Sequence, residues 1–316
     1  MKIGYFLSCE EFGPAELLRQ ARQAEAAGFH ALWISDHYHP WNDEQGESAF
    51  VWSVIGALAE AVDLPVTTAV TCPTVRIHPA VIAHAAATSA VMLGGRFGLG
   101  VGSGEALNEH IFGDPRPEAD ERLEMLEEAI EVIRALWSGS VVSHRGRHYR
   151  VEHARLYTLP ESPPPILVSG FGPKSVELAA RVGDGYCTTM PDAALIGRYR
   201  AAGGEGKPVH AGTKVCYGAD EAEARRTAHR IWANEALPGE LAQVLPTPEH
   251  FEQASSLVTE EMIGDSVPCG PDLERHVTAL QEFADAGVDE LFVQQIGDRQ
   301  DEFFGAYGRE VLPRFG

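Results

Sequence analysis

Short apolar runs alternate with amphipathic segments along almost the whole chain. The apolar runs predict eight strands, at 3–8, 31–35, 65–71, 96–101, 166–169, 186–189, 209–217 and 290–296. Between them the apolar residues recur at helical spacing, as in the segment 118–137. Strands that alternate with helices predict a parallel sheet, and eight repeats favour a closed (β/α)8 TIM barrel over an open doubly wound sheet.

Two stretches interrupt this alternation. Residues 141–157 alternate polar and apolar positions around a central Arg-Gly-Arg, which predicts a β-hairpin. Residues 236–270 contain no clean strand and predict a helical insertion with loops. The expected fold class is therefore α/β, a (β/α)8 TIM barrel with these two insertions, built as a single domain over 1–316.

Composition narrows the classes of function. Hydrophobic residues make up 44% of the chain, which is enough for a large core. The net charge of −21 disfavours a nucleic-acid partner, because phosphate backbones require basic patches. The cysteines are scattered, so the sequence supports neither a zinc site nor a disulfide framework. Without a signal-peptide pattern or a long apolar run, we expect a cytoplasmic protein with a small-molecule partner and no membrane contact.

Polar and glycine residues collect where the predicted strands end. In (β/α)8 barrels the active site lies at the carboxyl ends of the strands. The sequence places Glu10, Asp36-His37, 71–74, Gly102–Glu105 and 170–172 at such ends. We therefore expect these segments to meet in the mouth of one barrel.

An acid–histidine pair with a nearby tryptophan is the first candidate for chemistry. Asp36 and His37 follow the second strand, and Trp41 lies in the same loop. A carboxylate can tune an imidazole for proton transfer, although neighbouring strand residues point to opposite faces and the two side chains need not touch. The alternative is that the pair caps a loop and that Trp41 anchors it to the barrel rim.

Two glycine loops are the next candidates. Gly102-Ser103-Gly104-Glu105 follows the fourth strand, where glycines allow close approach to a ligand. The alternative is a tight turn in which Glu105 caps a helix. Gly170-Phe171-Gly172 opens a helix beside Lys174 and suits an anion such as phosphate. The alternative there is an ordinary loop between a strand and a helix.

Taken together, these motifs resemble the bacterial luciferase-like superfamily. The runs SDHYHPW, GVGSGEALNE and ARVGDGY resemble its coenzyme F420-dependent branch, which includes the F420-dependent glucose-6-phosphate dehydrogenases. The resemblance implies a barrel, a homodimer and a deazaflavin cofactor that carries hydride. It also implies catalytic roles: His37 takes the hydroxyl proton of the substrate, Trp41 lies beside the reacting carbon, Glu105 protonates the reduced ring, and Asp36 supports histidine and cofactor. Glu10 would line the site with His37 and Trp41.

The resemblance also implies a cofactor site. Ala69 and Val70 fall where the family has a non-proline cis peptide against the deazaflavin ring. Further lining positions are Asp36, Thr74, Ser103, Gly104, Glu105, Ala106 and Asn108. Gly170, Phe171 and Gly172 match the loop for the cofactor phosphate, with Phe171 standing where the family has a glycine.

The substrate side departs from the sugar-phosphate enzymes. The segment 188–191 contains no lysine, and 260–262 is acidic where a cation is expected. An anion is unfavourable beside unpaired carboxylates, so we expect a neutral alcohol, hemiacetal or ketone. Two other interpretations stay open, an FMN-dependent monooxygenase of the same superfamily and a non-catalytic deazaflavin-binding barrel. Substrate, direction and the role of 236–270 are not determined by the sequence.

Overall fold

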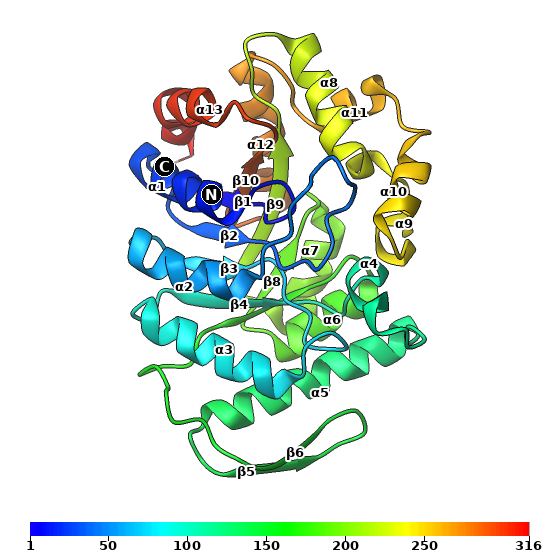
Figure 1. Cartoon of the computed structure of the whole chain (residues 1–316). Coiled ribbons are helices and arrows are strands. Elements are labelled where there is room, and N and C mark those ends of the chain that lie inside the picture. The colour runs from blue at the N-terminus through cyan, green and yellow to red at the C-terminus, as the bar shows by residue number, and fades with distance from the viewer. Residues whose placement is uncertain (316) are drawn as a thin grey trace.

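The computed structural model describes residues 1–315 and contains a closed parallel barrel (Figure 1). Around the barrel the strands follow the order β1-β10-β9-β8-β7-β4-β3-β2. The strands are β1 (Lys2–Leu7), β2 (Leu32–Ile34), β3 (Val66–Thr68), β4 (Phe97–Val101), β7 (Ile166–Ser169), β8 (Gly185–Thr188), β9 (Val209–Val215) and β10 (Glu290–Gln295). This confirms the predicted (β/α)8 fold.

Helices follow the strands and cover the outside of the barrel. They are α1 (Pro14–Ala27), α2 (Val51–Ala61), α3 (Pro79–Met92), α5 (Ala119–Trp137), α6 (Pro173–Val182), α7 (Ala193–Tyr199), α8 (Glu221–Trp232), α12 (Leu273–Ala286) and α13 (Gln300–Ala306). The short helix α4 (Ala106–Glu109) lies instead in the barrel mouth, in the loop after β4. Short helical turns extend several of them: η1 (His110–Phe112), η2 (Arg200–Gly204), η3 (Ala233–Ala236), η4 (Tyr307–Val311) and η5 (Leu312–Arg314). No helix within residues 1–315 is long and apolar enough to cross a membrane.

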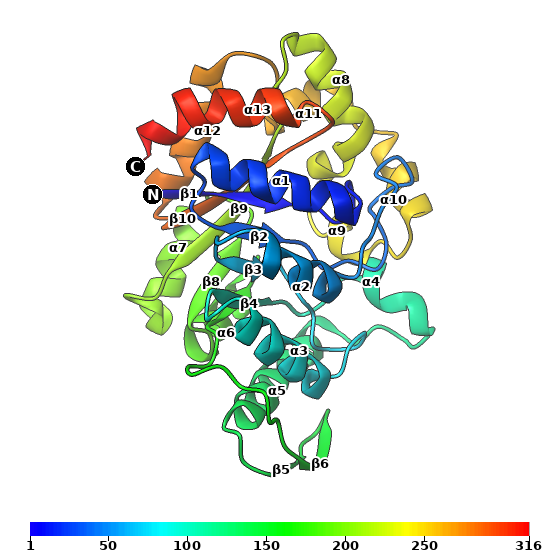
Figure 2. The same cartoon turned by 60° about the vertical axis from the view of Figure 1, so that its left-hand side comes forward.

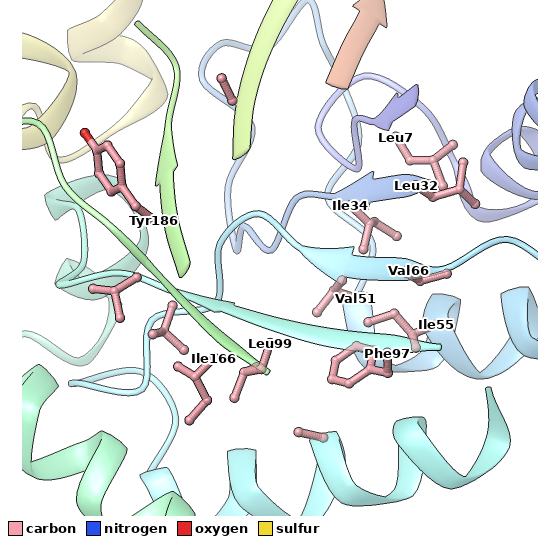
Figure 3. Close-up of a cluster of buried hydrophobic side chains, with 14 of the residues drawn as sticks. Leu7, Leu32, Ile34, Val51, Ile55, Val66, Phe97, Leu99, Ile166 and Tyr186 are labelled. Atoms are coloured by element: carbon pink, nitrogen blue, oxygen red, sulfur yellow. The ribbon is translucent and has the colours of Figure 1, made fainter. Parts of the chain in front are cut away.

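The strands bury side chains on both faces, which explains their continuous apolar runs. Outward-facing side chains pack under the helices, as Figure 3 shows for the cluster around Leu7, Ile34 and Leu99. Inside the barrel, Trp33 and Phe292 stack with ring centroids 4.5 Å apart. The interior is therefore filled, and a ligand is confined to the mouth.

Both predicted insertions are present. The hairpin consists of β5 (Val142–Arg145) and β6 (Arg150–Ala154), and it projects beside α5. The second insertion forms α9 (Leu241–Val244), α10 (Pro248–Ser255) and α11 (Glu260–Ser266). Figures 1 and 2 place it beside α8, at the end of the molecule away from the hairpin.

The largest difference from the predicted strands is in the third strand, and one short helix was not predicted. The third strand ends at Thr68 rather than at residue 71, and the Ala69–Val70 peptide bond that follows it is cis. Thr71 returns only as an isolated bridge to Val101. The short helix α4 was not predicted, since its four residues give no helical period.

Candidate active site

His37 lies at the centre of the polar groups in the barrel mouth. Its Nε2 atom is 3.4 Å from Oε1 of Glu10 and 3.7 Å from Oε2 of Glu105. Glu10 follows β1, His37 follows β2 and Glu105 follows β4, so three separate strand ends deliver the three side chains. Two carboxyl groups and an imidazole within reach of one another are groups that can exchange a proton, which suits acid–base chemistry.

Glu10 is held by two hydroxyl groups. The side chains of Ser8 and Ser35 both donate to its Oε2 atom, over 2.7 and 2.6 Å. Glu10 is 2% exposed. Because both hydroxyls bind Oε2, the Oε1 atom remains directed toward His37.

Trp41 packs between the imidazole and the helical insertion. Its ring centroid is 4.9 Å from that of His37 and 5.0 Å from that of Phe251 on α10. The Trp41 backbone N–H donates to Gln45. Trp41 is thus both a loop anchor and a wall of the site, so the two interpretations of this residue are compatible.

Glu105 occupies the residue before α4 without acting as its cap. Its side chain makes no capping hydrogen bond, which excludes the alternative that Glu105 only caps a helix. Burial raises the pKa of the Glu105 carboxyl, and the nearby His37 partly lowers it. A carboxyl with a raised pKa keeps its proton to higher pH and can serve as an acid.

Asp36 is directed away from the imidazole that follows it. Its Oδ2 atom accepts a 2.7 Å hydrogen bond from Thr71, and Oδ1 pairs with Arg76 at 2.5 Å. The His37 ring contacts the His39 carbonyl, Asn108 and Glu10 instead. The Asp36 carboxylate therefore does not support His37 by direct contact. Arg76 was not singled out from the sequence, because only the fold brings it to Asp36.

Ala69 and Val70, directly after β3, form what we call the apolar platform. Ala69 and Val70, joined by the cis bond that the resemblance implies, are half-buried above the apolar interior of the barrel. A Cβ atom on Gly100 would come within 2.0 Å of the Thr68 carbonyl oxygen, and one on Gly102 within 2.8 Å of Val70. These glycines let the platform and β4 approach each other closely. An apolar platform packed against the end of β4 suits the ring of a deazaflavin or flavin.

Glu109 packs against the glycine loop, and the sequence analysis did not identify it as a site residue. Its Oε1 atom accepts a 2.6 Å hydrogen bond from Thr74. A Cβ on Gly104, whose φ is +92°, would lie 2.1 Å from the same carboxylate. Glu109 therefore joins the loops after β3 and β4. Its burial, which the sequence does not reveal, raises the pKa of its carboxyl.

The loop for the expected phosphate begins α6. The Gly172 N–H donates to the Ser175 hydroxyl, and the Gly170 carbonyl accepts from Tyr186. Lys174 pairs with Asp120 at 2.7 Å on the surface. Phe171 is 43% exposed, so an apolar side chain lies at the surface of this loop.

Comparison with known proteins assigns the chain to a family. The sequence model described as luciferase-like monooxygenase matches residues 1–290. The chain belongs to this family. A member from Microbacterium testaceum (strain StLB037), an F420-dependent glucose-6-phosphate dehydrogenase, is 36% identical over 99% of this chain and 97% of the relative. An F420-dependent hydroxymycolic acid dehydrogenase from Mycobacterium tuberculosis (strain ATCC 25618 / H37Rv) is 37% identical over 90% of this chain and 81% of its own.

Two solved structures agree with the barrel. An F420-dependent secondary alcohol dehydrogenase, solved with an F420-acetone adduct, superposes with a TM-score of 0.91 at 27% identity over 98% of both chains. A coenzyme F420-dependent tetrahydromethanopterin reductase from Methanopyrus kandleri has a TM-score of 0.81 at 20% identity, covering 100% of both chains, and shows the shared fold.

Proposed function

We propose that this protein is a coenzyme F420-dependent dehydrogenase or reductase that acts on CH–OH groups. The observation that carries the proposal is the placement of His37 within reach of both Glu10 and Glu105 in the barrel mouth. The F420-dependent dehydrogenases among its relatives support the cofactor and the reaction class.

The residues present fit a deazaflavin. The half-buried Ala69 and Val70 would lie against its ring, and the loop from Ser103 to Asn108 would border it, as the resemblance implies. The N-terminus of α6 suits a phosphate, which would have to take over the Gly170 and Gly172 N–H groups from the Cys187 carbonyl oxygen and the Ser175 hydroxyl. When bound, the cofactor supplies the carbon that accepts or gives the hydride.

Side chains of this protein would accept and donate the protons of the reaction. In the oxidation direction His37 accepts the hydroxyl proton of the substrate, and the protonated Glu105 carboxyl donates its proton toward the ring. Trp41 covers the imidazole and holds the substrate against it. Asp36, paired with Arg76, keeps the loop that carries His37 in place.

For the substrate we propose a neutral alcohol or ketone rather than a sugar phosphate. Two cations act on the Glu105 carboxylate, and both have other partners: Lys214 pairs with Glu235 at 2.7 Å, and Arg116 donates to the Gly104 carbonyl oxygen. Glu260 and Glu261 are exposed on the first turn of α11. A phosphate in the mouth would have to draw Lys214 away from Glu235, which is unfavourable.

The test of the reaction is the His37→Ala variant. Turnover of a secondary alcohol with coenzyme F420 should fall by about 100-fold or more, while the affinity for the cofactor changes little. Undiminished turnover would remove His37 from the mechanism. Preferential FMN binding with oxygen uptake would favour a monooxygenase, and cofactor binding without turnover over a broad alcohol and ketone panel would favour a binding protein.

Comparing a secondary alcohol with glucose 6-phosphate tests the substrate class. The alcohol should give the higher kcat/KM, and Lys214→Met should leave the ratio of the two substrates nearly unchanged. A higher kcat/KM for the phosphate, lost on changing Lys214, would contradict the neutral-substrate proposal.

We also propose that the protein forms a homodimer. Helix α3 is apolar on nearly all sides, and it exposes Val81, Val91 and Met92 by 58, 42 and 46%. A second copy of the chain is the occupant we expect on this face. Light scattering should give twice the chain mass, reduced to one chain mass by Val81→Glu with Met92→Glu. A cytoplasmic location stays a prediction.

A further inference from the structure

The side-chain amide of Asn108 has an orientation that its neighbours dictate. Its Oδ1 atom accepts hydrogen bonds from the backbone N–H groups of Tyr38 and His39, over 2.8 and 3.4 Å. The reverse orientation would direct the amide hydrogens at these two donors. The Nδ2 atom must therefore face the opposite side, where it meets the catalytic groups.

On that side, Nδ2 lies 3.2 Å from Nδ1 of His37 and 3.5 Å from Oε2 of Glu105. An amide nitrogen only donates, so the Nδ1 atom of His37 must accept and carries no proton in this arrangement. The proton of neutral His37 then resides on Nε2, which faces Oε1 of Glu10 at 3.4 Å.

We propose that Asn108 is a positioning residue that fixes the tautomer of His37 with the proton on Nε2. In this tautomer neutral His37 offers a hydrogen-bond donor to a substrate oxygen, which favours the carbonyl form of the substrate. The consequence for turnover rests on the proposed function, whereas the tautomer itself is a property of the protein without cofactor.

The opposite tautomer has its own partner in the structure. The His39 carbonyl oxygen lies 3.3 Å from Nδ1 of His37 and can accept a proton carried there. Removal of a hydroxyl proton at Nε2 requires this second tautomer, because Nε2 must then be bare. Asn108 thus favours the tautomer protonated on Nε2, and the His39 carbonyl favours the tautomer protonated on Nδ1. With the Asn108 amide oriented as it is, Nε2 of neutral His37 is a hydrogen-bond donor rather than a base.

The test uses histidine labelled with nitrogen-15 in the full-length protein without cofactor. Long-range proton–nitrogen correlation distinguishes bare from protonated ring nitrogens, and His37→Gln identifies the His37 signals. At a pH at which the spectrum shows a neutral His37 ring, the wild type should show bare Nδ1 and protonated Nε2. A protonated Nδ1 in the wild type would overturn the proposal, whether or not any variant folds.

Asn108→Asp supplies the reciprocal arm. One carboxylate oxygen still accepts from the N–H groups of Tyr38 and His39. The other oxygen replaces the amide nitrogen that faces Nδ1 of His37, and because it accepts a hydrogen bond, the proton of the ring should move to Nδ1. The control is Asn42→Asp, because Asn42 ties the same loop to the Ile231 carbonyl and should leave the wild-type pattern. An unchanged tautomer in Asn108→Asp would contradict the proposal.

Activity separates this inference from the proposed function. The reversed tautomer in Asn108→Asp should shift the pH dependence of kcat for alcohol oxidation, whereas Asn42→Asp should keep the wild-type profile. If no alcohol or ketone is turned over, the proposed function fails while the measured tautomer still stands. If the wild-type tautomer is wrong but F420-dependent turnover is present, only the inference fails.

Discussion

At the scale of single residues, the site depends on contacts between segments that are distant in sequence. Asp36 binds Thr71 and Arg76, and Glu109 binds Thr74. The sequence offers the residue types and the strand ends at which they lie, so it could predict that His37 and Glu105 share a mouth. It could not predict which carboxylate faces the imidazole, because this depends on side-chain directions in irregular loops.

Gly104 allows a direct test of the cofactor loop. Gly104→Ala places a Cβ against the Glu109 carboxylate at a φ of +92°, and we expect cofactor affinity to fall by about ten-fold or more. The matched control is Gly113→Ala, where φ is +76° and nothing lies within 4 Å of the added Cβ. Tryptophan fluorescence quenching on titration with coenzyme F420 measures both. An equal loss of cofactor affinity in the two variants would mean that backbone strain alone, and not the contact with Glu109, causes the loss.

Glu105 links the site to pH. Burial raises the pKa of its carboxyl, so the protonated form persists to higher pH than for an ordinary glutamate. If Glu105 gives its proton during alcohol oxidation, single-turnover hydride transfer should slow as the pH rises through this raised pKa. In Glu105→Gln, which binds no titrating proton there, this alkaline limb should disappear. An unchanged limb in the variant would assign the titration to another group.

At the scale of elements, the alternation of apolar runs was sufficient to predict all eight barrel strands and both insertions. Most of the strands are buried on both faces and leave an apolar run in the sequence, whereas β9 includes the half-buried His210 and Lys214. The cis bond at Ala69–Val70 leaves no such pattern, and only the resemblance implied it. Helix α4 was missed because four residues complete barely one turn.

The packing of α12 against η4 carries a pH-dependent stability. His276 is fully buried, with Nδ1 against the Tyr307 hydroxyl and Nε2 against the Gly270 carbonyl oxygen. Burial lowers the pKa of His276 from 6.5 to about 4. The unfolded chain therefore binds a proton first as the pH falls below 6.5, and stability is lost from there down to about pH 4.

Urea unfolding of the wild type and of His276→Gln measures this loss. Between neutral pH and about pH 5, the wild type should lose about 2 kcal/mol more than the variant, which cannot titrate at this position. Tyr307→Phe is the control, because it removes one hydrogen bond but keeps the buried imidazole and so should keep the pH dependence. If the free energy of unfolding changes equally with pH in wild type and His276→Gln, His276 has the same pKa in the folded and the unfolded chain, which contradicts the prediction.

At the scale of the whole molecule, charge repulsion and ion pairing oppose each other in their response to salt. The chain has 46 acidic residues against 25 lysines and arginines. Many of its ion pairs are exposed, such as Lys174–Asp120 with side chains 71 and 68% exposed, and such pairs contribute between about 0 and 1 kcal/mol each. The excess of 21 negative charges repels itself across the entire surface of the folded chain.

We expect the repulsion to dominate at low ionic strength. Raising the salt to about 0.15 M shortens the screening length to about 8 Å, which weakens long-range repulsion more than pairs already in contact. The Tm should therefore rise by about 2 °C or more, the change expected for about 1 kcal/mol in a chain of this size. Sucrose at equal osmolarity controls for surface exclusion. A Tm that falls with salt would mean that the surface ion pairs outweigh the acidic excess, and that the stability of this barrel depends on them.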